Sequence, residues 1–275
     1  MKVRHCLMGF VLASLLPLSN HAQAQTSSSE TSEGSSAGDN VANRANNPLT
    51  PTVMLSVHDY YIPSLSGIHD RDANQTLLRG LMPHLTGGLP QLFRVTVPIS
   101  HVPQFPYGNT TAVGDTTFMD LFMFPGEGVS FGVGPVLVAP TAGNDSTGSG
   151  KWQAGAAGVA VYAGSWGLIG NLTIYQQSFA GKANREDAMS LTNQPIIFFN
   201  LPDDFYLRSS GIWSFNLRNG DYYIPVGLGV GKIWPVAEKV KLNAFVEPQY
   251  TVAYKGIGAP RWQIYCGFNV QISVM

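Results

Sequence analysis

The chain has 275 residues, a formal net charge of −1, 44% hydrophobic residues and only 12% charged residues. Soluble domains usually contain about 25% charged residues, so this composition is unusually poor in charge. A balance so close to neutral lacks the basic surplus with which proteins neutralise nucleic-acid phosphates, and we expect no nucleic-acid partner.

The first 24 residues have the features of a secretory signal peptide. Lys2 and Arg4 provide a basic start, residues 6–18 are mainly apolar, and the Ala-Gln-Ala of residues 22–24 fits a cleavage site. The apolar run is short for the alternative, a membrane anchor, because a spanning helix needs about 20 apolar residues. We expect residues 1–24 to direct export and then to be removed, which leaves one cysteine and no intrachain disulfide.

The next segment, residues 25–47, reads QTSSSETSEGSSAGDNVANRANN and is rich in Ser, Asn, Gly and acidic residues. Such a composition buries too little apolar surface to offset the entropy lost on folding. We therefore predict a disordered periplasmic tail over residues 25–47.

From residue 48 onward, apolar-rich segments of about 10–15 residues alternate with clusters of Gly, Pro, Asn and Asp, as in all-β barrels and sandwiches. We predict strands at residues 51–60, 75–84, 90–99, 113–124, 128–139, 151–163, 166–179, 189–201, 205–217, 221–234, 239–254 and 261–274.

The connections between these strands alternate in length. The long YIPSLSGIHDRDAN is followed by LTGGL, the long SHVPQFPYGNTTA by PGEG, the long PTAGNDSTGSG by AGS, and AGKANREDA by LPDD. Bacterial outer-membrane barrels have short periplasmic turns and longer outer loops. A soluble sandwich has no reason to alternate in this way, although RNGD, near the end, is short for an outer loop.

The last segment, RWQIYCGFNVQISVM, shows the side-chain pattern most clearly. Every second residue from Trp262 to Val274 is apolar, and the residues between them are mostly polar. Successive side chains of a strand point to opposite faces, so one face is apolar and the other polar. The run is longer than the roughly 9–11 residues that cross a bilayer, whereas ordinary strands have about 5–6 residues.

These patterns together predict an all-β fold, namely a transmembrane antiparallel up-and-down β-barrel of about twelve strands over residues 48–275. After the signal peptide we find no candidate spanning helix, and within lipid only helices and closed barrels satisfy every backbone group. We expect the protein in the bacterial outer membrane, with outer-membrane lipid and the barrel-assembly machinery as partners.

The sequence also resembles a known family. AVGDTTF, FGVGPVLVAPTA, GSGKWQAG, QQSFAG, NQPIIFFNLPDDFYLRSSG and YYIPVGLGVGKIW, in this order from residue 112 to residue 234, look like motifs of the outer-membrane transporter family named for the meta-pathway of phenol degradation. The resemblance covers most of residues 48–275. It implies an outer-membrane barrel that transports small aromatic or other hydrophobic compounds, and it implies no catalytic residue. Met275 departs from the aromatic residue, usually Phe, at which such barrels often end.

Several polar side chains lie opposite the more apolar face of their strand, and we predict that they line a water-filled interior. The candidates are Arg94, Asp120, Arg208, Lys239, Lys241, Glu247, Arg261, Gln263 and Asn269. Basic residues outnumber acidic ones among them, which favours anions because fixed charges set the selectivity of a narrow pore. Alternatively, these charges pair across the interior and block it. Gly227, Gly229 and Gly231 face the same side and leave space or allow curvature.

Four tryptophans lie near predicted strand ends. Trp152 and Trp262 are beside long connections, and Trp166 and Trp234 are beside short ones. Aromatic girdles occupy both interfaces of membrane barrels, so we expect two of these side chains at each interface.

Motifs for catalysis are present only in part. GVSFG at residues 128–132 matches G-x-S-x-G, but a nucleophile elbow needs a following helix and Ser130 precedes a strand-like run. GSGK at residues 148–151 lacks the first Gly and the Ser/Thr of a phosphate loop. No histidine has metal-ligand spacing to a cysteine or another histidine, and His69-Asp70-Arg71-Asp72 fits a solvated charged loop better than a cation site. We expect no enzyme, no cofactor and no metal.

Three function classes are left. The first is a channel or transporter for a small-molecule solute, and the second is a structural or binding barrel plugged by residues 25–47. The third is an outer-membrane hydrolase, which needs Ser, His and an acidic partner close together.

Overall fold

The computed structural model describes residues 41–105, 107–124, 126 and 128–274. The predicted signal peptide and residues 25–40 of the predicted tail lie outside the described residues. The described part contains one short helix and a 15-stranded sheet. The bounds are α1 (Val41–Asn46), β1 (Thr52–Leu65), β2 (Ala73–Thr86), β3 (Leu89–Pro103), β4 (Asn109–Val113), β5 (Thr116–Phe124), β6 (Val129–Ala139), β7 (Lys151–Gly164), β8 (Gly167–Gly181), β9 (Met189–Asn200), β10 (Phe205–Ser209), β11 (Trp213–Asn216), β12 (Tyr222–Gly227), β13 (Gly229–Ala237), β14 (Val240–Lys255) and β15 (Pro260–Ser273).

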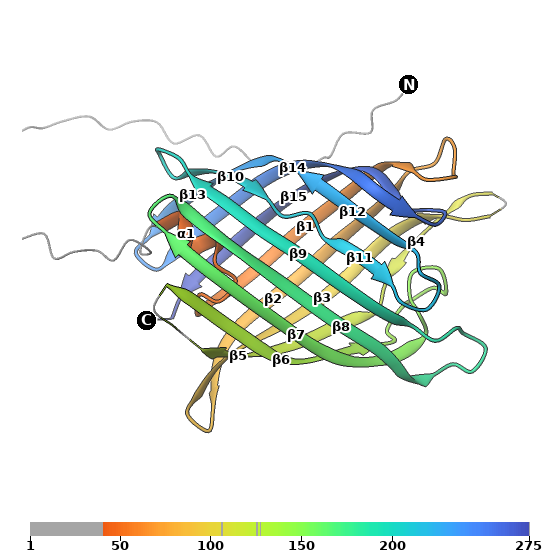
Figure 1. Ribbon diagram of the computed structural model, residues 1–275, viewed down its shortest axis with the longest axis horizontal. Helices are drawn as coiled ribbons and strands as arrows, with labels where there is room; N and C mark the ends of the chain where they lie inside the picture. The colour runs from red at the N-terminus through yellow and green to blue at the C-terminus, as the bar shows by residue number, and fades with distance from the viewer. Residues whose placement is uncertain (1–40, 106, 125, 127, 275) are drawn as a thin grey trace, which may run out of the picture. The chain divides into compact units, whose positions relative to one another are not determined.

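The sheet closes into a barrel (Figure 1). Strands that follow one another pair antiparallel, and β1 pairs with β15 to complete the ring. Three barrel strands are interrupted: β4 and β5 both pair with β3, β10 and β11 both pair with β9, and β12 and β13 both pair with β14. Each such pair counts as one strand, so the described residues form a closed antiparallel barrel of 12 strands. The predicted fold class is confirmed.

Alternate residues of each strand face the interior and the outer surface. In β15, Gln263, Asn269 and Gln271 are buried, whereas Trp262 and Ile264 are 51% and 41% exposed. Exposed apolar side chains recur around the whole barrel; examples are Leu55, Leu78, Val133, Ile169, Phe199, Val230 and Val252. The outer surface is therefore largely apolar, and the inner face of β15 is largely polar, as the alternation in the last segment predicts; other strands place apolar side chains on the inner face as well.

The connections differ in length between the two ends of the barrel. Residues 87–88, 165–166 and 238–239 form tight turns at one end, and residues 140–150 and 182–188 form longer loops at the other. The predicted alternation of short and long connections is therefore present.

The shortest turns use residues that tolerate a left-handed backbone. Gly87 and Gly88 have φ of 60° and 81°, as expected for a two-residue hairpin turn that follows the twist of the strands. Asp203 and Asp204 have φ of 57° and 58° between β9 and β10. A short side chain that bonds to its own backbone permits this conformation in Asp.

Two of the longer loops hold each other in place. Lys182 Nζ lies 2.9 Å from Asp145 Oδ1, and this hydrogen bond holds the pKa of the Asp145 carboxyl below its usual value. Arg185 donates hydrogen bonds to the carbonyl oxygens of Asp145 (2.7 Å) and Gly148 (2.6 Å). These contacts join the loops that precede β7 and β9.

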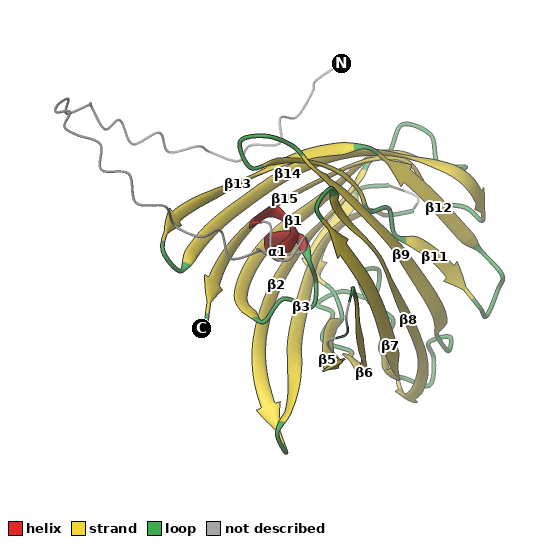
Figure 2. Cartoon of the chain, turned by 60° about the vertical axis from the view of Figure 1, so that its left-hand side comes forward, coloured by secondary structure: helices red, strands yellow, loops and turns green. Residues whose placement is uncertain are grey.

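The helix α1 lies inside the barrel, as Figure 2 shows. Ala42 and Asn43 are 2% and 1% exposed, and Ala42 belongs to the same apolar cluster as residues of the barrel wall. For Val41–Asn46 the prediction of a disordered tail is wrong. The segment is too polar to fold alone, but the interior of the barrel supplies apolar and hydrogen-bonding partners.

Large side chains cover the inward-facing glycines. A Cβ at Gly231 would overlap the ring of Tyr206, and a Cβ at Gly267 would overlap the ring of Phe245. The sequence allowed two interpretations of the glycines at residues 227–231, open space or curvature. At Gly231 the structure shows no open space. The glycine allows an aromatic ring of a neighbouring strand to lie flat against the wall.

Candidate functional site

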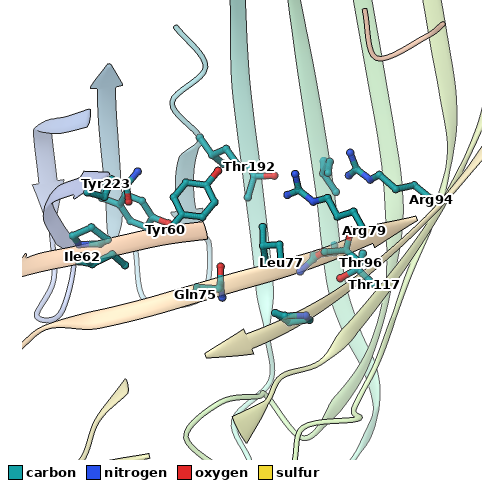
Figure 3. Close-up of a pocket in the computed structure, with 16 residues that line it drawn as sticks. Tyr60, Ile62, Gln75, Leu77, Arg79, Arg94, Thr96, Thr117, Thr192 and Tyr223 are labelled. Atoms are coloured by element: carbon teal, nitrogen blue, oxygen red, sulfur yellow. The ribbon is translucent and has the colours of Figure 1, made fainter. Parts of the chain in front are cut away.

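The barrel interior contains a cavity of about 340 Å³, here called the outer cavity (Figure 3). Its apolar lining includes Ile62, Leu77, Ile174 and Ile212, and its polar lining includes Tyr60, Gln75, Arg79, Arg94, Thr192 and Gln263. Six strands from β1 to β9 contribute to this wall, together with β12, β15 and the link between β10 and β11. Among the described residues, no aspartate or glutamate lines the outer cavity.

A second cavity of about 150 Å³, the inner cavity, extends from the same region to α1. Its lining includes Ala45 and Asn46 of α1, and it shares Arg79 and Arg94 with the outer cavity. The two arginines therefore lie where the two cavities adjoin.

Arg79 is held by a histidine on the neighbouring strand. Its Nη1 lies 2.9 Å from His58 Nδ1, and the hydroxyl of Tyr265 lies 2.9 Å from the same nitrogen. A guanidinium can only donate, so Nδ1 accepts and the ring proton is on Nε2. His58 Nε2 then donates to Asn269 Oδ1 at 2.8 Å. With a proton on one nitrogen only, His58 is neutral in this arrangement.

A buried ion pair lies beside this group. Arg208 Nε donates to Glu247 Oε2 at 2.7 Å, and the guanidinium carbon lies 3.5 Å from the centre of the Phe245 ring. Glu247 also accepts hydrogen bonds from Ser210 N, Ser210 Oγ and Gln249 Nε2, each at 2.8 Å. With 0% of the Glu247 side chain and 6% of the Arg208 side chain exposed, these contacts replace water as their partners.

Hydrogen bonds attach α1 to the barrel wall. Asn43 Nδ2 donates to Gly164 O at 2.7 Å, and Asn43 Oδ1 accepts from Asn200 Nδ2 at 2.9 Å. Asn46 Oδ1 accepts from Asn243 Nδ2 at 3.1 Å. Gly164 precedes the turn at residues 165–166, so α1 covers the interior at the end with short turns.

Most of the predicted interior residues are placed on the inner face. Gln263, Asn269, Arg208 and Glu247 are buried there, and Arg94 lines both cavities. Lys241 lies close to the turn before β14 and lines a pocket of about 270 Å³ that also contains Arg44 and Gln271. The five buried or cavity-lining residues come together around the two cavities, and Lys241 lies at their edge.

The prediction is wrong for Asp120. Its neighbours Met119 and Leu121 are each 3% exposed on the inner face, so Asp120 points outward, where its Oδ1 lies 3.0 Å from His84 Nε2. Residues 116–124 carry apolar side chains on both faces, and the sequence therefore does not reveal which set faces inward.

The prediction is also wrong for Arg261 and Lys239. Arg261 donates to the hydroxyls of Tyr254 (2.7 Å) and Tyr250 (3.0 Å), whose strand neighbours Gln249 and Thr251 are buried inward. Irregular pairing with β1 near the start of β15 interrupts the alternation there. Lys239 is exposed in the turn before β14, one residue outside the strand to which we assigned it.

Sequence reasoning missed His58, Tyr60 and Arg79. All three lie on the inner faces of β1 and β2, together with the apolar Leu77 and Leu81. This mixture concealed the polar face of both strands. The inner face of β1 can be identified from its partner β15, whose alternation is clear. Tyr60 is opposite Tyr265 and His58 is opposite Gly267, so these residues share a face.

The four tryptophans lie on the outer surface. Trp152, Trp166, Trp234 and Trp262 are 40%, 41%, 40% and 51% exposed. Trp152 and Trp262 follow loops, whereas Trp166 lies in a short turn and Trp234 precedes one.

Comparisons with known proteins agree with this architecture. No family profile matches the chain, and no curated protein matches it by sequence. Among solved structures, an outer membrane channel from Pseudomonas putida F1 is similar with a TM-score of 0.59 at 13% identity, over 82% of this chain and 98% of that one. This chain has the fold of an outer-membrane β-barrel.

Two further structures are more distant. The KdgM porin aligns with 81% of this chain and 100% of its own at a TM-score of 0.42 and 11% identity. The Escherichia coli outer membrane phospholipase A aligns with 84% of this chain and 96% of its own at a TM-score of 0.33 and 14% identity. Scores this low carry no argument about function. The resemblance to the phenol meta-pathway family stays a prediction.

The described residues lack the features of two other site types. No histidine ring nitrogen there lies within hydrogen-bonding distance of a serine Oγ. The same residues contain no cluster of three or more His, Cys, Asp or Glu side chains that could hold a metal ion. No helix among them is both long and apolar enough to cross a membrane.

Proposed function

We propose that the protein is an outer-membrane channel that passes small solutes through the barrel interior. The observation that carries this proposal is an apolar outer surface around an interior in which polar and charged side chains line two adjoining cavities. Membrane barrels have this distribution because their outer face contacts lipid and their inner face contacts water. Likeness in fold to an outer membrane channel supports it.

In this proposal the four outer tryptophans mark the two membrane interfaces, with the short turns in the periplasm and the loops outside. A peptide tag inserted at Asn144, in the loop before β7, should be labelled on intact cells. A tag at Gly126, in the turn before β6, should be labelled only after permeabilisation. The opposite result would contradict this orientation.

We propose that the interior favours anionic solutes. Arg79, Arg94 and Arg208 face inward, and Glu247 is the acidic partner of Arg208 alone. An excess of fixed positive charge in a narrow passage favours anions. Small aromatic or other hydrophobic compounds are the solute class that the family resemblance suggests, and an aromatic acid combines both properties.

The helix α1 favours a second candidate function, that of a plugged structural or binding barrel. It lies across the inner cavity and is held by hydrogen bonds to β7, β9 and β14. For a channel, this segment must shift to let a solute pass. In a plugged barrel it would remain in place.

Single-channel conductance in planar bilayers separates the two candidates. Replacing Asn43 and Asn46 with Ala removes three hydrogen bonds from α1 to the wall, each contributing roughly 0.5–1.5 kcal/mol. We expect a larger or more frequent conductance than in the unmodified protein and than in Asn219→Ala, a control in an exposed loop. Ion flow through none of the three proteins would refute the channel and support the plugged barrel.

A further inference from the structure

Two half-buried arginines at the junction of the cavities have no acidic partner among the described residues. Arg79 and Arg94 lie on the adjacent strands β2 and β3, where Arg79 is opposite Thr96 and Arg94 is opposite Leu81. Figure 3 shows both guanidinium groups directed into the same space. Among the described residues, the only ion pair of an inward arginine is Arg208–Glu247, so neither Arg79 nor Arg94 has a carboxylate within 4.0 Å.

Their other contacts are too few to satisfy them. Arg79 bonds to His58, but its Nε has no hydrogen-bond partner within the part of the chain that the structure describes. Arg94 has a single contact of this kind, 3.8 Å from Nη2 to Met119 Sδ, and thioether sulfur is a weak acceptor. Two neighbouring cations repel each other, and partial burial removes some of their hydration, so an anion between them lowers the energy of the arrangement.

A third donor lines the same cavity. Tyr60 is 7% exposed, and its ring is stacked on Tyr265 with 4.2 Å between the centroids. The ring is therefore fixed, and Figure 3 shows Tyr60 and the two arginines projecting from the neighbouring strands β1, β2 and β3 into the cavity. No atom of the described residues meets hydrogen-bond geometry with the Tyr60 hydroxyl. One hydroxyl and two guanidinium groups are an oxyanion-binding set, because a guanidinium offers two parallel N–H donors to a carboxylate.

The apolar side chains of the outer cavity indicate that the anionic group belongs to a molecule with an apolar part. Ile62, Leu77, Ile174 and Ile212 line the outer cavity together with the polar groups. A fully hydrated inorganic anion gains nothing from such a surface, whereas an apolar ring or chain buries area against it. A volume of about 340 Å³ is at the lower end of the range for small-molecule sites.

We infer that Arg79, Arg94 and Tyr60 bind the carboxylate of a small organic acid whose apolar part packs in the outer cavity. This deepens the proposed function by naming the solute class, but binding itself does not require passage through the barrel. A bound carboxylate would accept hydrogen bonds from both guanidinium groups and the tyrosine hydroxyl, and so supply the missing acidic partner.

Isothermal titration calorimetry of the full protein in a nonionic detergent tests this site with benzoate as the probe. Benzamide, of nearly the same shape but uncharged, should bind at least tenfold more weakly than benzoate. Inorganic phosphate, which lacks the apolar part, should also bind at least tenfold more weakly. Equal binding of benzoate and benzamide would refute the role of charge, and equal binding of benzoate and phosphate would refute the apolar contribution.

Variants localise the effect. Arg79→Gln and Arg94→Gln should each weaken benzoate binding at least tenfold and leave benzamide binding unchanged. Tyr60→Phe should weaken it about two- to tenfold, the range for one hydrogen bond. Arg218→Gln, in an exposed loop, is the charge-matched control and should bind like the unmodified protein. Unchanged benzoate binding in both arginine variants would refute the site.

Two further measurements keep the test interpretable. Heat-modifiable gel migration shows whether each variant has folded, and the comparison of probes on the unmodified protein needs no variant at all. Conductance of the same preparations is recorded separately. A protein that conducts ions without binding benzoate refutes the site alone, and one that binds benzoate without conducting supports the site and refutes the channel alone.

Discussion

Removal of the buried carboxylate of Glu247 should be among the most destabilising single changes in the barrel. In Glu247→Ala, Arg208 stays 6% exposed with no counter-charge, and two donor groups of Ser210 lose their acceptor. Breaking a buried ion pair in this way typically costs about 3–5 kcal/mol, most of it from the charge left behind. We expect a loss of that size in the free energy of unfolding.

A double variant separates the charge from the packing. In Arg208→Met with Glu247→Leu, neither charge is left, and apolar side chains of similar length fill the space beside Phe245. Apolar replacement of a whole buried pair is often neutral or stabilising. We therefore expect the double variant to be more stable than either single variant, with a coupling energy above about 1 kcal/mol.

The assay is reversible urea unfolding in phospholipid vesicles, followed by tryptophan fluorescence, for the unmodified protein and the three variants. The reasoning fails if Glu247→Ala costs less than about 1 kcal/mol, or if the double variant loses as much as both single variants together. Either result would mean that water reaches Arg208 in spite of its burial.

Three other changes test the faces and the loops. Phe268→Arg, on the outer face near the middle of β15, should lower the free energy of unfolding by about 2–4 kcal/mol in the same assay. Gln176→Arg, in the outer cavity, should lower it by less than half as much. Equal losses would contradict the lipid-facing assignment. Gly231→Ala should cost about 1–3 kcal/mol because its Cβ meets a tyrosine ring, while Gly80→Ala, with open space around it, should cost little; the opposite order would contradict the packing of the inner face. The hydrogen bond from Lys182 lowers the pKa of the Asp145 carboxyl. The bond is therefore fully present above the usual carboxyl pKa of about 3.9 and is lost as pH falls through the lowered pKa. Hydrogen-exchange protection in residues 140–150 should therefore be constant from pH 8 to pH 5 and decrease below pH 4; a decrease already at pH 6 would contradict this cause.

The sequence predicted the barrel and its strands well because the strongest constraint on a membrane strand is local. A strand such as β15 must alternate apolar and polar side chains over its whole length, and this period is visible without any knowledge of its neighbours. The alternation of turns and loops is equally local. Both features placed the twelve strands close to their observed bounds.

The interior was harder to predict because it depends on packing between strands. Asp120 lies in a strand that is apolar on both faces, so only its burial relative to Met119 and Leu121 shows its direction. Arg79 shares its face of β2 with leucines, and it belongs to the site only because the neighbouring strand β3 places Arg94 close to it. The position of α1 likewise depends on Gly164 and Asn200, more than 100 residues away along the chain.

The pairing of β1 with β15 also has a consequence for how the barrel is made. This seam joins residues as far apart as Thr52 and Ser273, and it carries one of the longest ladders in the sheet. Until β15 is in place, both β1 and β14 expose unpaired N–H and C=O groups, which are costly in lipid and prone to pairing with another chain. Closing so distant a contact also costs more chain entropy than any hairpin of the barrel. Pairing of β15 therefore converts an aggregation-prone open sheet into a barrel without edges, and assembly should be slowest at this step.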